Sequence, residues 1–177
     1  VPLQSGDDEV LALMRRHYDT ELFRHKMELI KAAMPHAFIG VDLIVGARGE
    51  TEERFMRSCE FVASLPVSRL HVFTYSERPG TRALEIGPVV APEEKHRRTR
   101  RMLAVSETLY RNFASPFEGC VRPVLLEHSK PGRKMSGFTD NYLRVELDAP
   151  AELDNTIVPV RLGGLDSVEE IFKDSSL

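Results

Sequence analysis

The stretch FIGVDLIV at residues 38–45 decides the architecture of the first half of the chain. It is a short apolar run bounded by turn residues, which is typical of a strand buried on both faces of a parallel sheet. A Gly-rich turn follows at residues 46–49, and a helix is expected over residues 50–65. Residues 70–75, LHVFTY, predict the next strand. These segments together predict a β-α-β unit with parallel strands.

Two helices are expected before this unit. The first begins after Ser5 or Asp7, because either side chain can cap a helix N-terminus. The second runs from about Thr20 to Met34, where Pro35 stops it. No strand is expected at residues 1–3.

Beyond this unit, the sequence pattern changes at about Pro116 from helical spacing to short alternating segments. A long helix is predicted over residues 92–115, and short alternating segments separated by turn residues follow it, which favours a small β-barrel or sandwich. We expect an α/β part at residues 1–91, a connecting helix at 92–115, a small β domain at 116–165 and an acidic tail at 166–177.

Composition limits the protein class. The chain has 177 residues, a net charge of −3, 42% hydrophobic and 29% charged residues, as expected of a folded chain. No apolar stretch is long enough to cross a membrane, and no secretory signal is visible, so we expect a cytoplasmic protein without a membrane partner. The two cysteines exclude a disulfide framework, and the six histidines show no metal-ligand spacing, so no metal site is predicted.

Charge is concentrated in the long helix. Residues 92–115 hold six Lys or Arg and three Asp or Glu. Such a helix could follow phosphates, although a solvated helix face is the more common interpretation.

Several polar residues gather where the predicted parallel strands end. Gly46 opens a turn at the carboxyl end of one strand, which is where ligands of parallel sheets bind, and Arg78 lies in the loop after the next strand. An arginine there could bind a carboxylate or phosphate. Asp42 is the single charge within an apolar strand, so it requires either a ligand or an internal partner. No catalytic dyad is visible.

Basic and aromatic residues alternate in the predicted β domain. A small barrel with such a surface can hold single-stranded nucleic acid, although an ordinary exposed face has the same composition. The predicted RNA-binding residues of the β domain are Arg122, Lys130, Arg133, Lys134, Phe138, Asn141, Tyr142 and Arg144.

Several strings, taken together, resemble the methylthiotransferase family of radical S-adenosylmethionine enzymes. They are PLQSG at residues 2–6, MRR at 14–16, DLIVG at 42–46 with GET at 49–51, and YSERPGT at 75–81. The strings VLLE at 124–127, GFTDNY at 137–142 and VPV at 158–160 resemble the family's C-terminal TRAM domain, a small barrel that binds tRNA.

The resemblance implies a partial radical S-adenosylmethionine barrel followed by a TRAM barrel. It implies reductive cleavage of S-adenosylmethionine at an iron–sulfur cluster and methylthiolation of C2 of a modified adenosine beside the tRNA anticodon. VFTYSERPGT and TDNY resemble most the enzymes acting on N6-threonylcarbamoyladenosine, and the alternative is N6-isopentenyladenosine. The resemblance implies that Arg78 faces the tRNA substrate. The residues that it implies to bind S-adenosylmethionine are Gln4, Ser5, Arg16, Asp42, Ile44, Gly46, Tyr75 and Ser76.

The sequence departs from this family in two respects. The family holds one 4Fe-4S cluster with a CxxxCxxC motif and a second in an N-terminal domain, whereas Cys59 and Cys120 stand alone here. Ala47-Arg48 also replaces the usual Phe-Pro. The missing cluster motif predicts that the chain is an inactive C-terminal fragment. Its exposed sheet edge predicts that the fragment either dimerises or is only marginally stable. The alternatives are an RNA-binding module with a non-catalytic scaffold, and an independent α/β protein with its own ligand.

Overall fold

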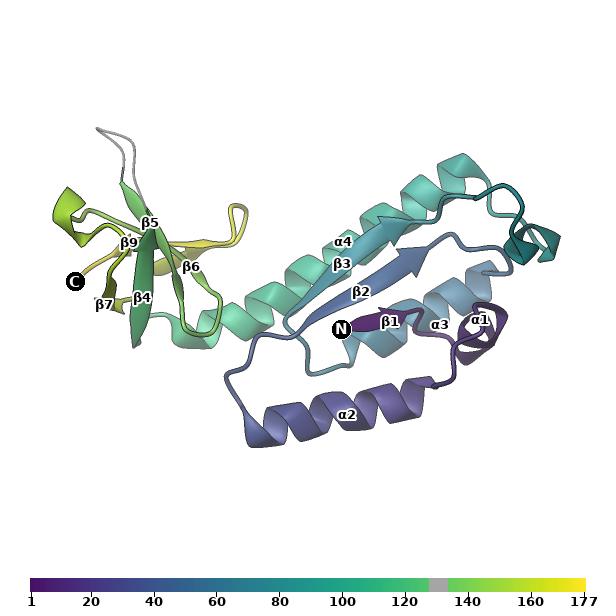
Figure 1. The fold of residues 1–177 in the computed structure, drawn as a ribbon, viewed down its shortest axis with the longest axis horizontal. Coiled ribbons are helices and arrows are strands. Elements are labelled where there is room, and N and C mark those ends of the chain that lie inside the picture. Colours follow the sequence, from purple (N-terminus) through teal and green to yellow (C-terminus); the bar gives the residue numbers. More distant parts are fainter. Residues whose placement is uncertain (128–133) are drawn as a thin grey trace. The chain divides into compact units, whose positions relative to one another are not determined.

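The computed structural model describes residues 1–127 and 134–177, and it divides into two compact units, residues 1–109 and 110–177 (Figure 1). Each unit is described by itself. The division falls within the long helix α4 (Pro92–Ala114), whose start at Pro92 agrees with the sequence prediction. None of the helices in the described ranges is long and apolar enough to cross a membrane.

The first unit is built on a parallel sheet of three strands in the order β1-β2-β3. Two helices lie between the first and second strands along the chain and one lies between the second and third (Figure 1). A short turn of 3₁₀-helix and the first part of α4 follow the third strand. The elements are β1 (Pro2–Gln4), α1 (Asp8–Leu13), α2 (Thr20–Ala33), β2 (Gly40–Val45), α3 (Glu52–Ala63), β3 (Arg69–Thr74) and η1 (Arg82–Glu85). The expected parallel α/β arrangement is confirmed, whereas these three strands do not by themselves form a barrel.

Strand β1 corrects the expectation that residues 1–3 form no strand. Pro2 pairs with Asp42 and Gln4 with Leu43 on β2. The strand is too short for an alternating pattern, so its existence depends on a partner some 40 residues away in the sequence.

Side-chain caps define where the helices of this unit begin. Asp7 accepts a hydrogen bond from the Val10 amide, and Asp19 and Thr51 make the equivalent contacts at the starts of α2 and α3. Each cap satisfies an amide that has no partner within its helix. Helix α3 consequently begins at Glu52, two residues later than expected.

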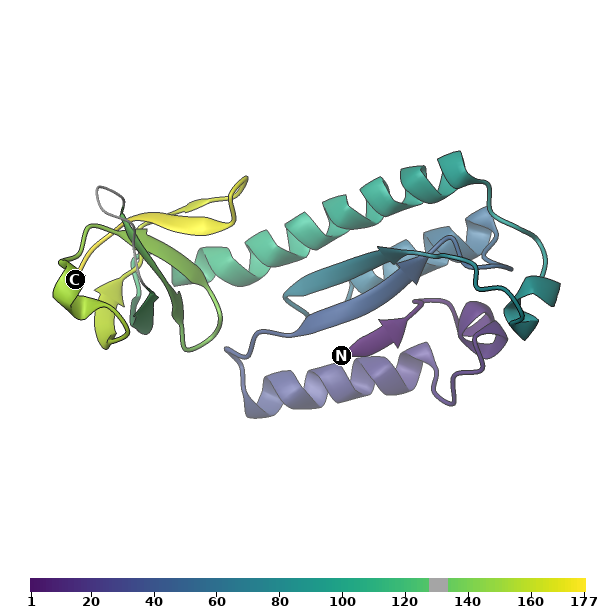
Figure 2. The same cartoon turned by 45° about the horizontal axis from the view of Figure 1, so that its top comes forward.

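The core of the first unit lies on one face of the sheet. Val41, Leu43 and Val45 of β2 are buried with apolar residues of α2, α3 and α4, which run lengthwise along the strands (Figures 1 and 2). The intervening residues of β2, among them Asp42 and Ile44, are only half-buried. The prediction of a strand buried on both faces is therefore wrong, because the helices of this unit cover only one face.

The second unit is a mixed sheet of six strands in the order β7-β4-β5-β6-β9-β8. Neighbouring strands are antiparallel except β6 and β9, which are parallel. This arrangement is consistent with the expected small β domain. Its elements are η2 (Ser115–Phe117), β4 (Val121–Glu127), β5 (Met135–Thr139), β6 (Arg144–Leu147), η3 (Ala151–Leu153), β7 (Ile157–Arg161), β8 (Gly164–Asp166) and β9 (Ile171–Ser175).

The last two strands correct the expectation that residues 166–177 form a tail. Val145 of β6 pairs with Phe172 of β9, and both side chains are fully buried. Ile171 is buried as well. Burial of two large apolar side chains outweighs the acidic character of the segment, so the sheet extends almost to the end of the chain.

Candidate functional site

A concave pocket of about 420 Å³ lies at the carboxyl ends of β2 and β3 in the first unit. Its wall continues into the loop after β3, and the lining residues are Ile44, Phe73, Thr74, Tyr75, Ser76, Arg78, Thr81 and Ala83. A pocket of this size suits a small molecule. The carboxyl ends of parallel strands are the usual position for a ligand, because side chains of successive loops converge there.

Two lining residues, Ile44 and Phe73, come from the face of the sheet that the helices leave open. Ile44 and Phe73 are register partners on β2 and β3, and Phe73 is 56% exposed. A large exposed aromatic side chain beside hydroxyl groups and an arginine can take a flat apolar ring together with polar substituents.

The structure brings four of the predicted site residues together in this pocket. Ile44, Tyr75 and Ser76, expected to bind the cofactor, line it with Arg78, expected to face the substrate. The sequence-based predictions missed the other lining residues. Phe73 could have been found, because it lies two residues from Tyr75 in a predicted strand, and residues two apart point to the same face of a sheet.

Asp42 lies on the same face of the sheet but outside the pocket lining. Its carboxylate is 36% exposed, and Oδ1 lies 3.3 Å from Nδ1 of His71, its register partner on β3. The sequence left open whether this charge has an internal partner, and His71 is that partner.

Gln4 and Arg16 are brought together outside the pocket lining. Arg16 Nη2 donates a hydrogen bond of 3.3 Å to Gln4 Oε1, and the Arg16 side chain is exposed. Ser5 is buried, and its hydroxyl accepts a hydrogen bond from the Asp7 amide. Ser5 therefore contributes to the start of α1.

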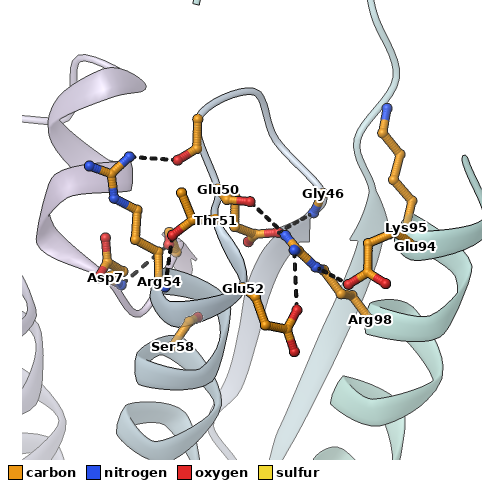
Figure 3. Close-up of polar contacts among 12 residues, drawn as sticks. Asp7, Gly46, Glu50, Thr51, Glu52, Arg54, Ser58, Glu94, Lys95 and Arg98 are labelled. Atoms are coloured by element: carbon orange, nitrogen blue, oxygen red, sulfur yellow. Dashed lines mark hydrogen bonds and ion pairs between the residues drawn. The ribbon is translucent and has the colours of Figure 1, made fainter. Parts of the chain in front are cut away.

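The Gly46 turn binds an internal anion (Figure 3). The Gly46 amide donates a hydrogen bond of 2.6 Å to Glu50 Oε2, so the chain's own carboxylate occupies the place that an external anion would take. Gly46 has φ +76°, and a Cβ added there would lie 2.5 Å from Cγ of Lys95. Glycine is required here by the backbone conformation and by the neighbouring helix.

Glu50 is in turn paired with Arg98 of α4, and both side chains are almost fully buried (Figure 3). Arg98 Nη1 donates hydrogen bonds of 2.9 Å to Glu50 Oε2 and 2.7 Å to the Glu50 carbonyl oxygen. Burial raises the pKa of the Glu50 carboxyl, against the lowering effect of the Gly46 amide and Arg98. The pair joins the β2–α3 turn to α4 and so fixes the end of β2 beside the pocket.

The basic first half of α4 is occupied largely by internal contacts. Arg97 pairs with Glu94 and Glu52, and Arg98 with Glu50. Lys95 Nζ donates to the Tyr75 carbonyl oxygen and lies 5.1 Å from the centre of the Tyr75 ring. The charge run predicted as a phosphate-binding or solvated face is thus mainly a set of links to the turns around the pocket.

The residues present do not fit an iron–sulfur cluster. In the ranges 1–127 and 134–177, no group of three His, Cys, Asp or Glu side chains could hold a metal ion. Cys59 is buried in the first unit, where desolvation raises the pKa of its thiol, and Cys120 is exposed in the second.

The second unit presents an apolar row across three strands of its sheet. Leu125 of β4 lies opposite Phe138 of β5 on one side and Ile157 of β7 on the other. Ile157 is 70% exposed and Leu125 44%. The Phe138 ring stacks on Tyr142, with ring centres 5.1 Å apart, and Arg144 is the register partner of Phe138 on β6. An exposed ring, Tyr142, stacked on the half-buried Phe138 beside a cation, is a surface on which nucleic-acid bases can stack.

The other predicted RNA-binding residues of this unit differ in availability. Arg122 donates hydrogen bonds from Nε and Nη2 to the two carboxylate oxygens of Asp140, and its guanidinium lies over the Phe117 ring. Lys134 Nζ lies 3.7 Å from Asp174 Oδ1. Asn141 is buried, and its Oδ1 accepts a hydrogen bond from Thr139 Oγ1, which supports the turn before Tyr142. Lys130 and Arg133 lie outside the described residues.

Comparison with known proteins confirms the resemblance seen in the sequence. The chain is 36% identical over 166 residues to threonylcarbamoyladenosine tRNA methylthiotransferase MtaB of Bacillus subtilis, covering 92% of this chain and 37% of that protein. It is 35% identical over 166 residues to tRNA-2-methylthio-N(6)-dimethylallyladenosine synthase of Chloroflexus aurantiacus, covering 92% and 35%.

The protein of the same name from Pelobacter propionicus is 34% identical over 179 residues, covering all of this chain and 39% of its own length. The chain therefore spans little more than a third of the relatives that it matches. No family model matches it.

Proposed function

We propose that this chain, a homologue of part of the tRNA methylthiotransferases, is the part of such an enzyme that holds the nucleoside of S-adenosylmethionine and binds tRNA. The observation that carries the proposal is the similarity of 34–36% over at least 92% of the chain to relatives named for tRNA methylthiolation. The pocket of the first unit and the stacked rings of the second support the two roles.

The proposed target is N6-threonylcarbamoyladenosine beside the anticodon. Support comes from the strings VFTYSERPGT and TDNY at residues 72–81 and 139–142 and from the relative that carries this nucleoside in its name. The alternative is the dimethylallyl (isopentenyl) adenosine named for the other relatives.

The pocket suits the adenosyl part of S-adenosylmethionine. Ile44 would border the adenosyl part, and Tyr75 and Ser76 would lie beside it at the end of the adjoining strand. When bound here, the cofactor would supply hydrogen-abstraction chemistry toward the target, and the electron for it would come from a cluster held by other parts of the protein. Arg78 would hold a phosphate or carboxylate of the substrate at the edge of the pocket.

Other proposed cofactor contacts lie outside the pocket lining. Arg16, which is paired with Gln4, would meet the carboxylate of S-adenosylmethionine, and Gln4 would face its ribose. Asp42, which is paired with His71, would border the adenosyl part. Two cysteines cannot supply the ligands of two 4Fe-4S clusters, so we propose that other parts of the protein hold them and that this chain alone is inactive.

The stacked rings of the second unit are proposed to hold unpaired bases of the tRNA. Tyr142 is 63% exposed, and Arg144 adds a positive charge beside the neighbouring Phe138. The net charge of the chain is close to zero, so binding rests on stacking with a modest electrostatic contribution. The proposed setting is the cytoplasm, where tRNA is modified.

Nucleoside analysis tests the function. Deleting the gene that encodes this chain should remove the methylthio group from N6-threonylcarbamoyladenosine in digested total tRNA, measured by mass spectrometry. Loss from N6-isopentenyladenosine instead would assign the alternative target. Unchanged methylthiolation of both nucleosides would refute the enzymatic role.

Binding of unmodified tRNA to the 177-residue chain tests the RNA-binding role separately. Tyr142→Ala should weaken binding by about tenfold, because one stacked base contributes about 1–3 kcal/mol. Val168→Ala is the matched control, since Val168 is 92% exposed in the same unit. Equal losses in both variants, or wild-type affinity that is independent of salt, would refute the proposed surface.

A further inference from the structure

The segment Glu77–Ile86 forms one wall of the pocket. Arg78, Thr81 and Ala83 line the pocket, and the segment contains only the short 3₁₀ turn η1. Its own hydrogen bonds, such as that from the Thr81 hydroxyl to the Arg78 carbonyl oxygen, are local. The position of this wall must therefore be set by contacts with the rest of the chain.

Within the part of the chain that the structure describes, the hydrogen bonds between this segment and residues outside it all come from Arg48. Arg48 Nε lies 2.7 Å from Glu77 Oε1, at the start of the segment. Its Nη1 donates to the carbonyl oxygens of Leu84 and Ile86, at the end. One side chain thus holds both ends of the wall.

Arg48 is well placed for this role, because its own backbone is firmly held. It lies between Ala47, which is buried, and Gly49, whose amide donates to the Pro88 carbonyl oxygen at 2.8 Å. The turn that carries it is fixed further by the buried Glu50. Only 17% of the Arg48 side chain is exposed.

We propose that Arg48 is a positioning residue that keeps the segment Glu77–Ile86 closed against the pocket. A planar guanidinium with several diverging N–H donors can serve a carboxylate and two carbonyl oxygens at once, which a lysine ammonium on a flexible stem does less well. Loss of Arg48 frees the wall, and Arg78, Thr81 and Ala83 lose their fixed places around a ligand. The effect on ligand affinity rests on the proposed function, whereas the closure of the wall does not.

Limited trypsin cleavage after Arg82 measures this closure. Cleavage follows the population of the open segment when opening is fast, so Arg48→Ala should raise the rate at this bond about tenfold. Arg48→Lys should give an intermediate rate. Arg24→Ala is the matched control, because Arg24 makes a comparable contact with Ser64 elsewhere in the unit, and it should leave cleavage after Arg82 unchanged.

The thermal midpoint of each variant is measured alongside, so that local opening is distinguished from general unfolding. Faster cleavage after Arg82 with an unchanged rate at the other trypsin sites supports the proposal. An unchanged rate after Arg82 in Arg48→Ala, or a parallel rise at every site, overturns it.

Titration with S-adenosylhomocysteine completes the test. Arg48→Ala should weaken its affinity at least fivefold relative to Arg24→Ala. Unchanged affinity despite faster cleavage overturns the positioning role. If the wild-type chain does not bind S-adenosylhomocysteine while Arg48→Ala still opens the segment, the closure stands and the proposed cofactor site fails.

Discussion

Replacing Arg98 with methionine tests the buried pair that fixes the end of β2. The substitution keeps a long apolar side chain but removes both hydrogen bonds to Glu50, whose carboxylate is 2% exposed. Breaking a buried ion pair from one side costs about 3–5 kcal/mol, because the remaining charge is left without its partner. We expect Arg98→Met to lower the free energy of unfolding of the first unit by this amount at pH 7.

Urea unfolding followed by circular dichroism at 222 nm measures the loss, since the long helices α2, α3 and α4 begin in this unit. Arg97→Met is the control. Arg97 is adjacent on α4, but its side chain is 46% exposed and binds the carboxylates of the exposed Glu52 and the half-buried Glu94. Its replacement should therefore lower the free energy of unfolding much less. Equal midpoints for Arg98→Met and Arg97→Met would refute the reasoning.

The same pair predicts a pH dependence. Burial already raises the pKa of Glu50 above its ordinary 4.5, and removing Arg98 removes an influence that lowers it. A carboxyl whose pKa is higher in the folded than in the unfolded state stabilises the folded state in its protonated form. This stabilisation is complete below the unfolded-state pKa, and it is lost as the pH rises through the folded-state pKa. The difference in free energy of unfolding between wild type and Arg98→Met should therefore shrink as the pH falls from 7 toward 4.5. In Glu50→Gln/Arg98→Met this trend should disappear.

The remaining predictions concern the turns, the proposed cofactor contacts and the sheet edge. Gly46→Ala should cost about 1–2 kcal/mol in urea unfolding, because alanine is strained at φ +76°; unchanged stability would contradict this. Asp7→Ala should lower the free energy of unfolding by about 1–2 kcal/mol in the same measurement, because the N-terminal cap of α1 is lost. Asp8→Asn is the control: it keeps an acceptor for the Thr20 amide, so it should lower the free energy of unfolding less. Asp42→Ala and Arg16→Ala should each weaken S-adenosylmethionine binding by the full-length enzyme in calorimetry, and unaltered affinity in both would remove these contacts. Sedimentation of the 177-residue chain should show concentration-dependent pairing of exposed sheet edges, and a monomer at all concentrations would contradict it.

Much of the local structure was predictable from the sequence. The apolar run at residues 38–45 contains β2, which begins two residues later, and the helix pattern from about 20 to 34 ends one residue beyond α2. Both matches are close because each element is encoded by neighbours within a few residues. Pro92 opens α4, as its fixed φ and missing amide predict. The turns at Gly46 and after Tyr75 were also correctly placed next to strand ends, since turn residues bound each apolar run.

The sequence by itself determined which segments are helices, which apolar runs are strands and which relatives the chain resembles, because periodicity and motifs are local. Tertiary structure alone decided that β1 and β9 exist, that one face of the first sheet is open, and that Glu50 meets Arg98. Partners separated by 48 residues leave no mark on local pattern. Only folding shows which charges are buried against each other, and which, like Arg48, hold a wall of the pocket.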